Sequence, residues 1–379
     1  MKLKIISSMI ALTFSGAISA NEVPASNTAN SELLNVHNRC IVQFNDAIDS
    51  SEVKGLAHGL AKKANASIKH IYQHSIKGFT INAPCMAAEK AFGQNSSIKS
   101  LSADGVISIN KSRKPVKEEP APSEVQEISY GTTRVGGAVD GTGYTAWVID
   151  TGVDLAHSDL NVDSSRGFTV FSRRGRPSLN DENGHGTHVA GTIGALDNAL
   201  GSLGVAPNTS IVPVRVLDRS GSGSYSGVIA GIDHVAALAS PGDCVNMSLG
   251  GGVSKEIDDA VIAAASNGAF FVLAAGNDGD DAENHSPARA EGPNVWTISA
   301  VDNNNTMPSW SNYGAGVDYA APGVSIFSLW KNGGTNTISG TSMAAPHACA
   351  VIMMTHGNPS TDGSSINDPD DNADPIIHL

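Results

Sequence analysis

Three glycine-rich stretches of the sequence each carry one residue with catalytic chemistry. "WVIDTGVD" places Asp150 at the end of an apolar strand, "NGHGTHVAGT" places His185 at a helix start, and "SGTSMAAPH" places Ser342 at another helix start. A serine hydroxyl becomes a good nucleophile when a neutral imidazole accepts its proton and a carboxylate stabilises the resulting imidazolium. Each residue alone also has a structural interpretation, as a turn former, a packed polar group or a helix cap. Together they predict a nucleophilic site.

The segments around these residues alternate between strand and helix patterns. The expected strands are "YTAWVID", "IVPVRVL", "CVNMSL", "AFFVLAAG" and "VWTISAV", and the expected helices are "HGTHVAGTIGAL", "YSGVIAGIDHVAALA" and "SKEIDDAVIAAASN". Apolar strands that alternate with helices predict an α/β fold, mainly a parallel sheet with helices on both faces. Such folds gather their functional residues at the carboxyl ends of the strands. The three residues are therefore expected to meet there.

The chain before this region divides into four parts. Residues 1–20 have the pattern of a secretory signal peptide, with lysines, then an apolar run, then small residues. Residues 21–39 are a polar spacer. Residues 40–110 follow a β-α-β-β-α-β order with "GVISIN" as the last strand, which predicts a small α+β domain. Residues 111–124 are a charged, proline-rich linker, a suitable place for a maturation cleavage.

Composition and charge limit the partners of the protein. The chain has 379 residues and a formal net charge of -13, and its longest basic block is the short "KSRKPVK" at 111–117. Nucleic acid is therefore an unsuitable partner. The N-terminal apolar run is shorter than the roughly 20 residues that span a bilayer, so we expect export to the extracellular space or periplasm without a membrane anchor.

The motifs "VIDTGVD", "HGTHVAGT" and "GTSMAAPH", in the order Asp, His, Ser, resemble the signatures of subtilisin-like serine proteases. The resemblance covers residues 125–356, and the preceding small domain resembles the ferredoxin-like inhibitory propeptide of that family. It implies a secreted, monomeric endopeptidase made as a self-processed zymogen, with protein or peptide substrates and its own propeptide as inhibitor. Asp150 would be the orienting acid, His185 the general base, Ser342 the nucleophile that forms an acyl-enzyme, and Asn277 an oxyanion donor.

The same resemblance implies residues for substrate binding and for a structural calcium ion. His188 would be a structural histidine packed inside. Glycines let a substrate backbone approach closely and bind as an added strand. The implied substrate-binding residues are Gly223, Ser248, Leu249, Gly250, Gly251, Ala275 and Gly276. The implied calcium ligands are Gln126, Asp159, Leu196, Asn198, Leu200 and Ser202, a set of oxygen donors that suits this cation.

Three alternatives are weaker. A zinc site of the metalloprotease type needs histidines four apart with a glutamate after the first, whereas His185 and His188 are three apart and lack that glutamate. An α/β-hydrolase esterase would have the order Ser, Asp, His, and Ala344 replaces the second glycine of its nucleophile elbow. A catalytically inactive binding protein, with the small domain bound permanently, would not need Asp150, His185, Ser342 and Asn277 to be intact.

Cysteine spacing and the C-terminus complete the predictions. Export gives Cys40, Cys85, Cys244 and Cys349 an oxidising environment, and we expect pairing within domains, Cys40 with Cys85 and Cys244 with Cys349. Two buried thiols remain the alternative for the second pair. The catalytic domain is predicted to end at residue 357, without the family's further terminal helix and strands. Residues 358–379 are predicted to be an acidic tail that binds another cation or is disordered.

Overall fold

The computed structural model describes residues 33, 35–109, 125–173 and 176–379. The predicted signal peptide (1–20), most of the spacer and the predicted linker (111–124) lie outside the described residues. Within the part of the chain that is described, no helix is both long and apolar enough to cross a membrane.

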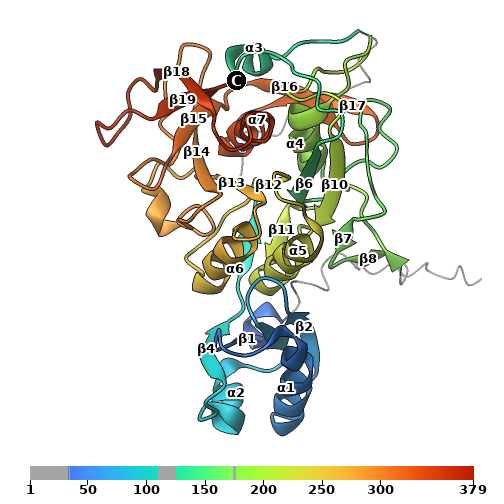
Figure 1. Ribbon diagram of the computed structural model, residues 1–379, viewed down its shortest axis with the longest axis vertical. Helices are drawn as coiled ribbons and strands as arrows, with labels where there is room; N and C mark the ends of the chain where they lie inside the picture. Colours follow the sequence, from blue (N-terminus) through green and yellow to red (C-terminus); the bar gives the residue numbers. More distant parts are fainter. Residues whose placement is uncertain (1–32, 34, 110–124, 174–175) are drawn as a thin grey trace, which may run out of the picture.

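A nine-stranded sheet forms the centre of the larger part of the chain (Figure 1). Its strands are β6 (Thr145–Asp150), β7 (Phe168–Thr169), β10 (Ser210–Arg215), β12 (Cys244–Met247), β13 (Phe270–Ala274), β14 (Val295–Val301), β15 (Tyr319–Pro322), β18 (Ser360–Ser364) and β19 (Pro375–His378). The strand order is β18-β19-β15-β14-β13-β12-β6-β10-β7, and each neighbouring pair is parallel except β18 with β19. The predicted α/β fold with a mainly parallel sheet is confirmed.

Helices cover both faces of this sheet. They are α4 (His185–Gly194) and α7 (Thr341–Met354) on one face and α5 (Tyr225–Leu238) and α6 (Lys255–Ala265) on the other (Figure 1). Alternate residues of β6 point to opposite faces, so Ala146 and Val148 pack with α4 and α7 while Trp147 and Ile149 pack with α5 and α6. This burial on both faces explains why the strands are continuous apolar runs.

Shorter elements lie around the sheet. They are α3 (Tyr130–Arg134), the paired strands β8 (Ser172–Arg173) and β9 (Arg176–Pro177), β11 (Ser222–Ser224), the 3-10 helix η3 (Ala282–Asn284), and the hairpin of β16 (Ile326–Trp330) and β17 (Gly334–Ile338). Strand β16 packs against α4, the helix that begins with His185.

The N-terminal part is a separate small domain with its own core. Its elements are η2 (Val36–Asn38), β1 (Cys40–Phe44), α1 (Ser50–Lys63), β2 (Ile68–Tyr72), β3 (Gly78–Ile81), α2 (Cys85–Phe92) and β4 (Ile98–Ala103). The sheet order is β2-β3-β1-β4, and α1 and α2 enclose an apolar core against it. The β-α-β-β-α-β order is therefore present. Within the described residues, the first regular element starts at Val36, inside the segment predicted to be a spacer.

The prediction of the last strand of this domain was wrong. The strand that completes its sheet is β4, "IKSLSA", and not "GVISIN". Strand β4 contains few apolar residues, whereas "GVISIN" after it is more apolar. The sequence pattern therefore favoured "GVISIN" as the last strand. That later segment contains β5 (Val106–Ser108), which leaves the domain and pairs antiparallel with β11. Its apolar residues are explained by this partner in the larger part of the chain.

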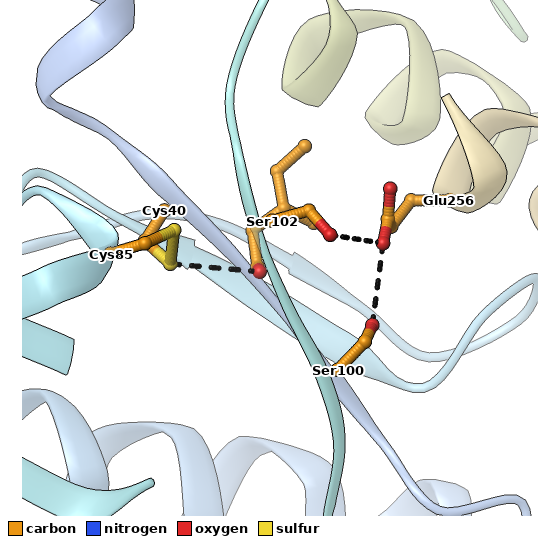
Figure 2. Close-up of a disulfide and its surroundings, with 6 residues drawn as sticks. Cys40, Cys85, Ser100, Ser102 and Glu256 are labelled. Atoms are coloured by element: carbon orange, nitrogen blue, oxygen red, sulfur yellow. Dashed lines mark hydrogen bonds between the residues drawn. A yellow bond between two sulfur atoms is a disulfide. The ribbon is translucent and has the colours of Figure 1, made fainter. Parts of the chain in front are cut away.

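Both predicted disulfides are present, and each lies within one domain. Cys40 in β1 is bonded to Cys85, the first residue of α2, with their Cα atoms 4.8 Å apart (Figure 2). Cys244 in β12 is bonded to Cys349 in α7, with their Cα atoms 5.9 Å apart. The second disulfide fixes α7 to the sheet that it covers.

The C-terminal residues form structure that the prediction of an acidic, disordered tail missed. Strands β18 and β19 form a hairpin, and β19 extends the main sheet beyond β15. Ile376 and Ile377 are buried, and buried Asp374 accepts a hydrogen bond of 2.5 Å from the Ser299 hydroxyl. The two isoleucines supply the apolar surface that holds the hairpin on the sheet, which the preceding acidic residues obscured in the sequence.

Candidate active site

The strand ends place the predicted catalytic residues at one edge of the sheet. Asp150 is the last residue of β6, Ser248 follows β12, and Asn277 follows β13. Strands β6, β12 and β13 are consecutive neighbours and parallel, so their carboxyl ends lie together. Helices α4 and α7 pack against each other, and they carry His185 and Ser342 in their first turns.

Asp150 and His185 are in direct contact. Both carboxylate oxygens of Asp150 lie 2.9 Å from Nδ1 of His185. Asp150 is fully buried, and its Oδ1 also accepts a 2.6 Å hydrogen bond from the backbone N–H of Thr151. A carboxylate can only accept, so Nδ1 carries the proton in this pair. Nε2 of His185 is then the basic nitrogen, as a general base requires.

Ser342 is buried at the second position of α7. Its hydroxyl donates a 3.3 Å hydrogen bond to the carbonyl of Ser248, and the Ser248 hydroxyl donates a 2.8 Å bond to the Ser342 carbonyl. Among the described residues, no hydrogen bond joins Ser342 to His185. The structure thus brings the acid and the base into contact, and holds the serine hydroxyl on the Ser248 carbonyl.

Asn277 is oriented by the helix that carries Ser342. Its Oδ1 accepts hydrogen bonds of 2.9 Å from the Thr341 N–H and 3.0 Å from the Thr341 hydroxyl. A Cβ atom at Gly340 would lie 3.2 Å from Nδ2 of Asn277 and 3.7 Å from the backbone nitrogen of Ser342. A side chain at position 340 would therefore press on the Asn277 amide beside the Ser342 N–H, which glycine avoids.

Strand β5 lies between the segment that contains Gly250 and the segment that contains Gly221 and Gly223. The backbone N–H of Ser108 donates to the Gly250 carbonyl at 3.2 Å, and the Gly250 N–H donates to the Ser108 carbonyl at 3.0 Å. On the other side, Ile109 N–H donates to the Gly221 carbonyl at 2.9 Å, and Gly223 lies opposite Ile107. The chain from the small domain is therefore the middle strand between β11 and the segment at Gly250, which follows Ser248 by two residues.

The model of the subtilase family matches residues 141–366, which include Asp150, His185, Asn277 and Ser342. The chain belongs to the subtilase family. It is thus a subtilisin-like serine protease by family, as the sequence motifs predicted.

The similarity to individual relatives covers more of the chain than the family model does. The chain is 43% identical over 303 residues to alkaline serine exoprotease A of Vibrio alginolyticus, with 76% of this chain and 53% of that protein covered. It is 38% identical over 295 residues to an extracellular serine proteinase of Thermus sp. strain Rt41A, with 76% and 68% covered. The crystal structure of a cold adapted subtilisin-like serine proteinase has a TM-score of 0.59 and 39% identity, covering 66% of this chain and 97% of that one. The subtilase thus spans about half the length of the Vibrio protein.

The second histidine of the subtilase motif, His188, is enclosed in the protein. Its Nε2 lies 3.0 Å from the Ile326 carbonyl, and its ring packs edge-on against Trp330. Burial, together with the neighbouring His185, lowers the pKa of His188 to about 3. The ring is therefore neutral at ordinary pH, and the prediction that His188 packs inside is confirmed.

The other predicted substrate-binding residues have varied surroundings. Leu249 packs in the core under α5 and α6. Gly251 N–H donates to the Ser286 carbonyl at 3.0 Å instead of to β5. Ala275 packs in a small alanine cluster, and Gly276 N–H donates to the Thr341 hydroxyl at 3.1 Å.

The predicted calcium ligands lie together in one loop region. Asp159 accepts hydrogen bonds from the Asn198 side chain (2.7 Å) and the Ser202 N–H (3.0 Å). The Gln126 side chain donates to the carbonyls of Leu196 (2.9 Å) and Ser202 (3.4 Å). Leu200 N–H donates to Asn198 at 2.7 Å.

This donor set is one carboxylate with neutral amide and carbonyl oxygens, which fits calcium chemistry. The part of the chain that is described contains no group of three or more His, Cys, Asp or Glu side chains suited to a metal. A cation here would therefore depend mainly on neutral oxygens. Burial raises the pKa of Asp159, and a bound cation would offset that cost of burying its charge.

Sequence reasoning missed one buried acid beside the catalytic pair. Asp181 lies four residues before His185 in "NDENGHGTH", and its carboxylate is buried among hydrogen-bond donors. Burial raises the pKa of Asp181, and hydrogen bonds from Gly184 and Thr187 oppose that rise. An acidic residue shortly before a helix is the signal that could have found it, because carboxylates favour helix N-termini.

Proposed function

We propose that this subtilase is a secreted serine endopeptidase that cleaves peptide bonds with Asp150, His185 and Ser342. We further propose that it is made as a zymogen that processes itself, with the N-terminal domain as its inhibitor. The observation that carries the proposal is strand β5, which lies between β11 and Gly250, two residues after Ser248.

The geometry supports acyl transfer in two steps. Nε2 of His185 takes the proton of the Ser342 hydroxyl, which must first leave the Ser248 carbonyl, and Oγ bonds to the substrate carbonyl carbon. The carbonyl oxygen becomes an oxyanion beside the Ser342 N–H and Nδ2 of Asn277. The imidazolium, held by Asp150, then gives its proton to the departing amine and leaves an acyl-enzyme. Water attacks the acyl group by the same proton route and regenerates Ser342.

Substrate would bind as the middle strand that β5 now forms. Main-chain hydrogen bonds to Gly250 and Gly221 hold the backbone of β5, so a peptide of many sequences could use the same donors and acceptors. Ser108 lies opposite Gly250, and continuing this antiparallel register by two residues reaches Ser248, whose carbonyl binds the Ser342 hydroxyl. We therefore propose that self-cleavage falls within residues 111–125, which follow β5, and gives the mature N-terminus just before Gln126.

Two carboxylates dock the N-terminal domain on helix ends of the catalytic domain. Asp104 accepts hydrogen bonds from the Ser226 N–H (3.0 Å) and hydroxyl (2.6 Å) in the first turn of α5. Glu256, in the first turn of α6, accepts from the hydroxyls of Ser100 (3.3 Å) and Ser102 in β4 (Figure 2). A carboxylate at a helix N-terminus is favourable, so Asp104 of the N-terminal domain caps helix α5 of the larger domain.

Apolar packing also joins the two domains at their interface. Ile41, Tyr72, Ile76 and Ile107 of the N-terminal part are buried in the same cluster as the apolar residues of α5 and α6. Such burial stabilises the larger domain while the inhibitor is bound, which supports a role in folding as well as inhibition.

Secretion and calcium binding belong to the same proposal. The signal-peptide pattern of residues 1–20 and the extracellular relative support export. Gln126, Asp159 and Asn198, with the backbone of Leu196, Leu200 and Ser202, would hold a calcium ion that stabilises the fold.

A Ser342→Ala precursor tests the proposed function. We expect it to remain uncut and to hydrolyse no casein, whereas the matched control Ser266→Ala, on an exposed helix end, matures and cleaves like the wild type. A Ser342→Ala chain that matures by itself and digests casein would contradict the proposal. A wild type that hydrolyses simple esters but no peptide would favour an esterase instead.

A further inference from the structure

Asp181 is a fully buried carboxylate that receives an unusual number of hydrogen bonds. Its donors are Thr151 Oγ1 (2.9 Å), Asn183 N (2.8 Å), Gly184 N (2.8 Å), Thr187 N (3.0 Å) and Thr187 Oγ1 (2.7 Å). All five donors are neutral N–H or O–H groups, so the ionised carboxylate is the form that can accept all of them.

The donors belong to the two elements that hold the acid and the base. Thr151 directly follows Asp150, and its N–H donates to the Asp150 carboxylate. The Thr151 hydroxyl also accepts a 2.9 Å hydrogen bond from Gly186 N–H, next to His185. Asp181 therefore connects the end of β6 to the first turn of α4 through side chains and backbone.

Asp181 also supplies the charge that the start of α4 lacks. The residue before the helix is Gly184, which has no side chain for capping, and the first turn of α4 contains no acidic residue. The positive end of a helix dipole disfavours a protonated histidine at the first position, where His185 lies. A carboxylate that binds the free N–H groups of this turn offsets that effect.

We propose that Asp181 is a positioning residue that fixes His185 against Asp150 and favours the protonated form of His185 during catalysis. The inference rests on the proposed function of the Asp150, His185 and Ser342 group.

Other charged groups nearby are accounted for. Asp150 contacts His185 directly, and buried His188 is neutral. Glu182 is paired with Arg215 at 3.0 Å, and Asp154 accepts the Gly333 N–H at 2.9 Å. Of these groups, only Asp150 binds the imidazole of His185. Asp181 therefore adds a second negative charge, which acts on His185 through the N-terminus of α4.

The test compares Asp181→Asn with wild type in peptide hydrolysis from pH 5 to 10. We expect kcat to fall about 10- to 100-fold while KM stays within about twofold, because a small misplacement of a catalytic group costs up to roughly 100-fold. We also expect the acid limb of the kcat/KM profile to move to lower pH by about 0.2 to 1.5 units, the size of a helix-end charge effect. The matched control is Asp374→Asn, a buried carboxylate at the far edge of the sheet, which should keep the wild-type kcat and acid limb.

A second variant separates position from charge. Thr151→Ala removes the hydroxyl that joins Gly186 to Asp181 but keeps the Asp181 charge, so kcat should fall while the acid limb stays in place. If Asp181→Asn does not fold, judged by loss of its melting transition, Thr151→Ala decides: a wild-type kcat would overturn the inference. If Asp181→Asn folds, an unchanged kcat and acid limb would overturn it. A wild type that cleaves no peptide would instead refute the proposed function.

Discussion

Removal of one carboxylate on α5 should speed the release of the N-terminal domain, the proposed inhibitor. Asp233 accepts hydrogen bonds from the backbone N–H groups of Gln73 (3.0 Å), His74 (2.7 Å) and Ser75 (2.7 Å), and from the Ser75 hydroxyl (2.9 Å). All these donors lie in the turn between β2 and β3 of the N-terminal domain. Asp233→Ala therefore removes an acceptor that serves the interface between the domains.

The size of the effect follows from the loss of a buried, charged acceptor. Truncating one partner of such an arrangement costs about 2 to 5 kcal/mol, and each 1.4 kcal/mol is a factor of ten. With an unchanged association rate, the N-terminal domain, once cleaved as proposed, should dissociate about 30 to 4,000 times faster. The assay dilutes the processed complex and follows the recovery of peptide hydrolysis with time.

The matched control is Asp259→Asn in the same interface. Asp259 is partly exposed and interacts with Gln43 (3.2 Å), Lys99 (3.8 Å) and Lys255 (2.5 Å). Such surface pairs contribute about 1 kcal/mol or less, so release should accelerate at most about fivefold. Release of the Asp233→Ala complex at the wild-type rate would refute this account of the interface.

Three further predictions concern stability. EDTA should lower the melting temperature and accelerate autolysis, because a ligand of the folded state stabilises it; Asp159→Asn should abolish this response, and identical melting with and without calcium would exclude the site. Replacing Cys244 and Cys349 by serine should lower the free energy of unfolding by about 2 to 4 kcal/mol, since the bridge closes a loop of sequence separation 105; free thiols in non-reducing peptide mapping would contradict it. Burial, together with nearby Asp368, Asp370 and Asp318, raises the pKa of Asp374 to about 7, although the Ser299 hydrogen bond opposes the rise. The folded state thus holds this proton more tightly than the unfolded state, and stability should decline from about pH 4 to about pH 7. Asp374→Asn, which stays neutral, should gain more in melting temperature at pH 8 than at pH 5, and an equal change at both would refute the assignment.

The positions of the proposed catalytic residues could be predicted from the sequence because each lies in a long local motif. Asp150, His185 and Ser342 end a strand or begin a helix, and the parallel sheet then brings strand ends together. The disulfide between Cys244 and Cys349 was predictable for a related reason, since distances along a strand and a helix place both at similar depth.

Features that depend on partners distant in the sequence could not be predicted. Strand β5 has the local pattern of its own domain, but its hydrogen bonds are with β11 and Gly250. The buried role of Asp181 depends on Thr151, which lies 30 residues away in the sequence. The hairpin at the C-terminus needs the exposed edge of β15, which the acidic composition of the segment does not reveal.

Covalent labelling tests the central claim most directly. A biotinylated fluorophosphonate should modify the mature protein once, and peptide mapping should place the adduct on Ser342, because the reagent phosphonylates a serine activated by a neighbouring histidine. His185→Ala, which keeps the hydroxyl but removes the base, should label far more slowly. No adduct on Ser342 in folded, mature protein, or equal labelling of His185→Ala, would contradict the account.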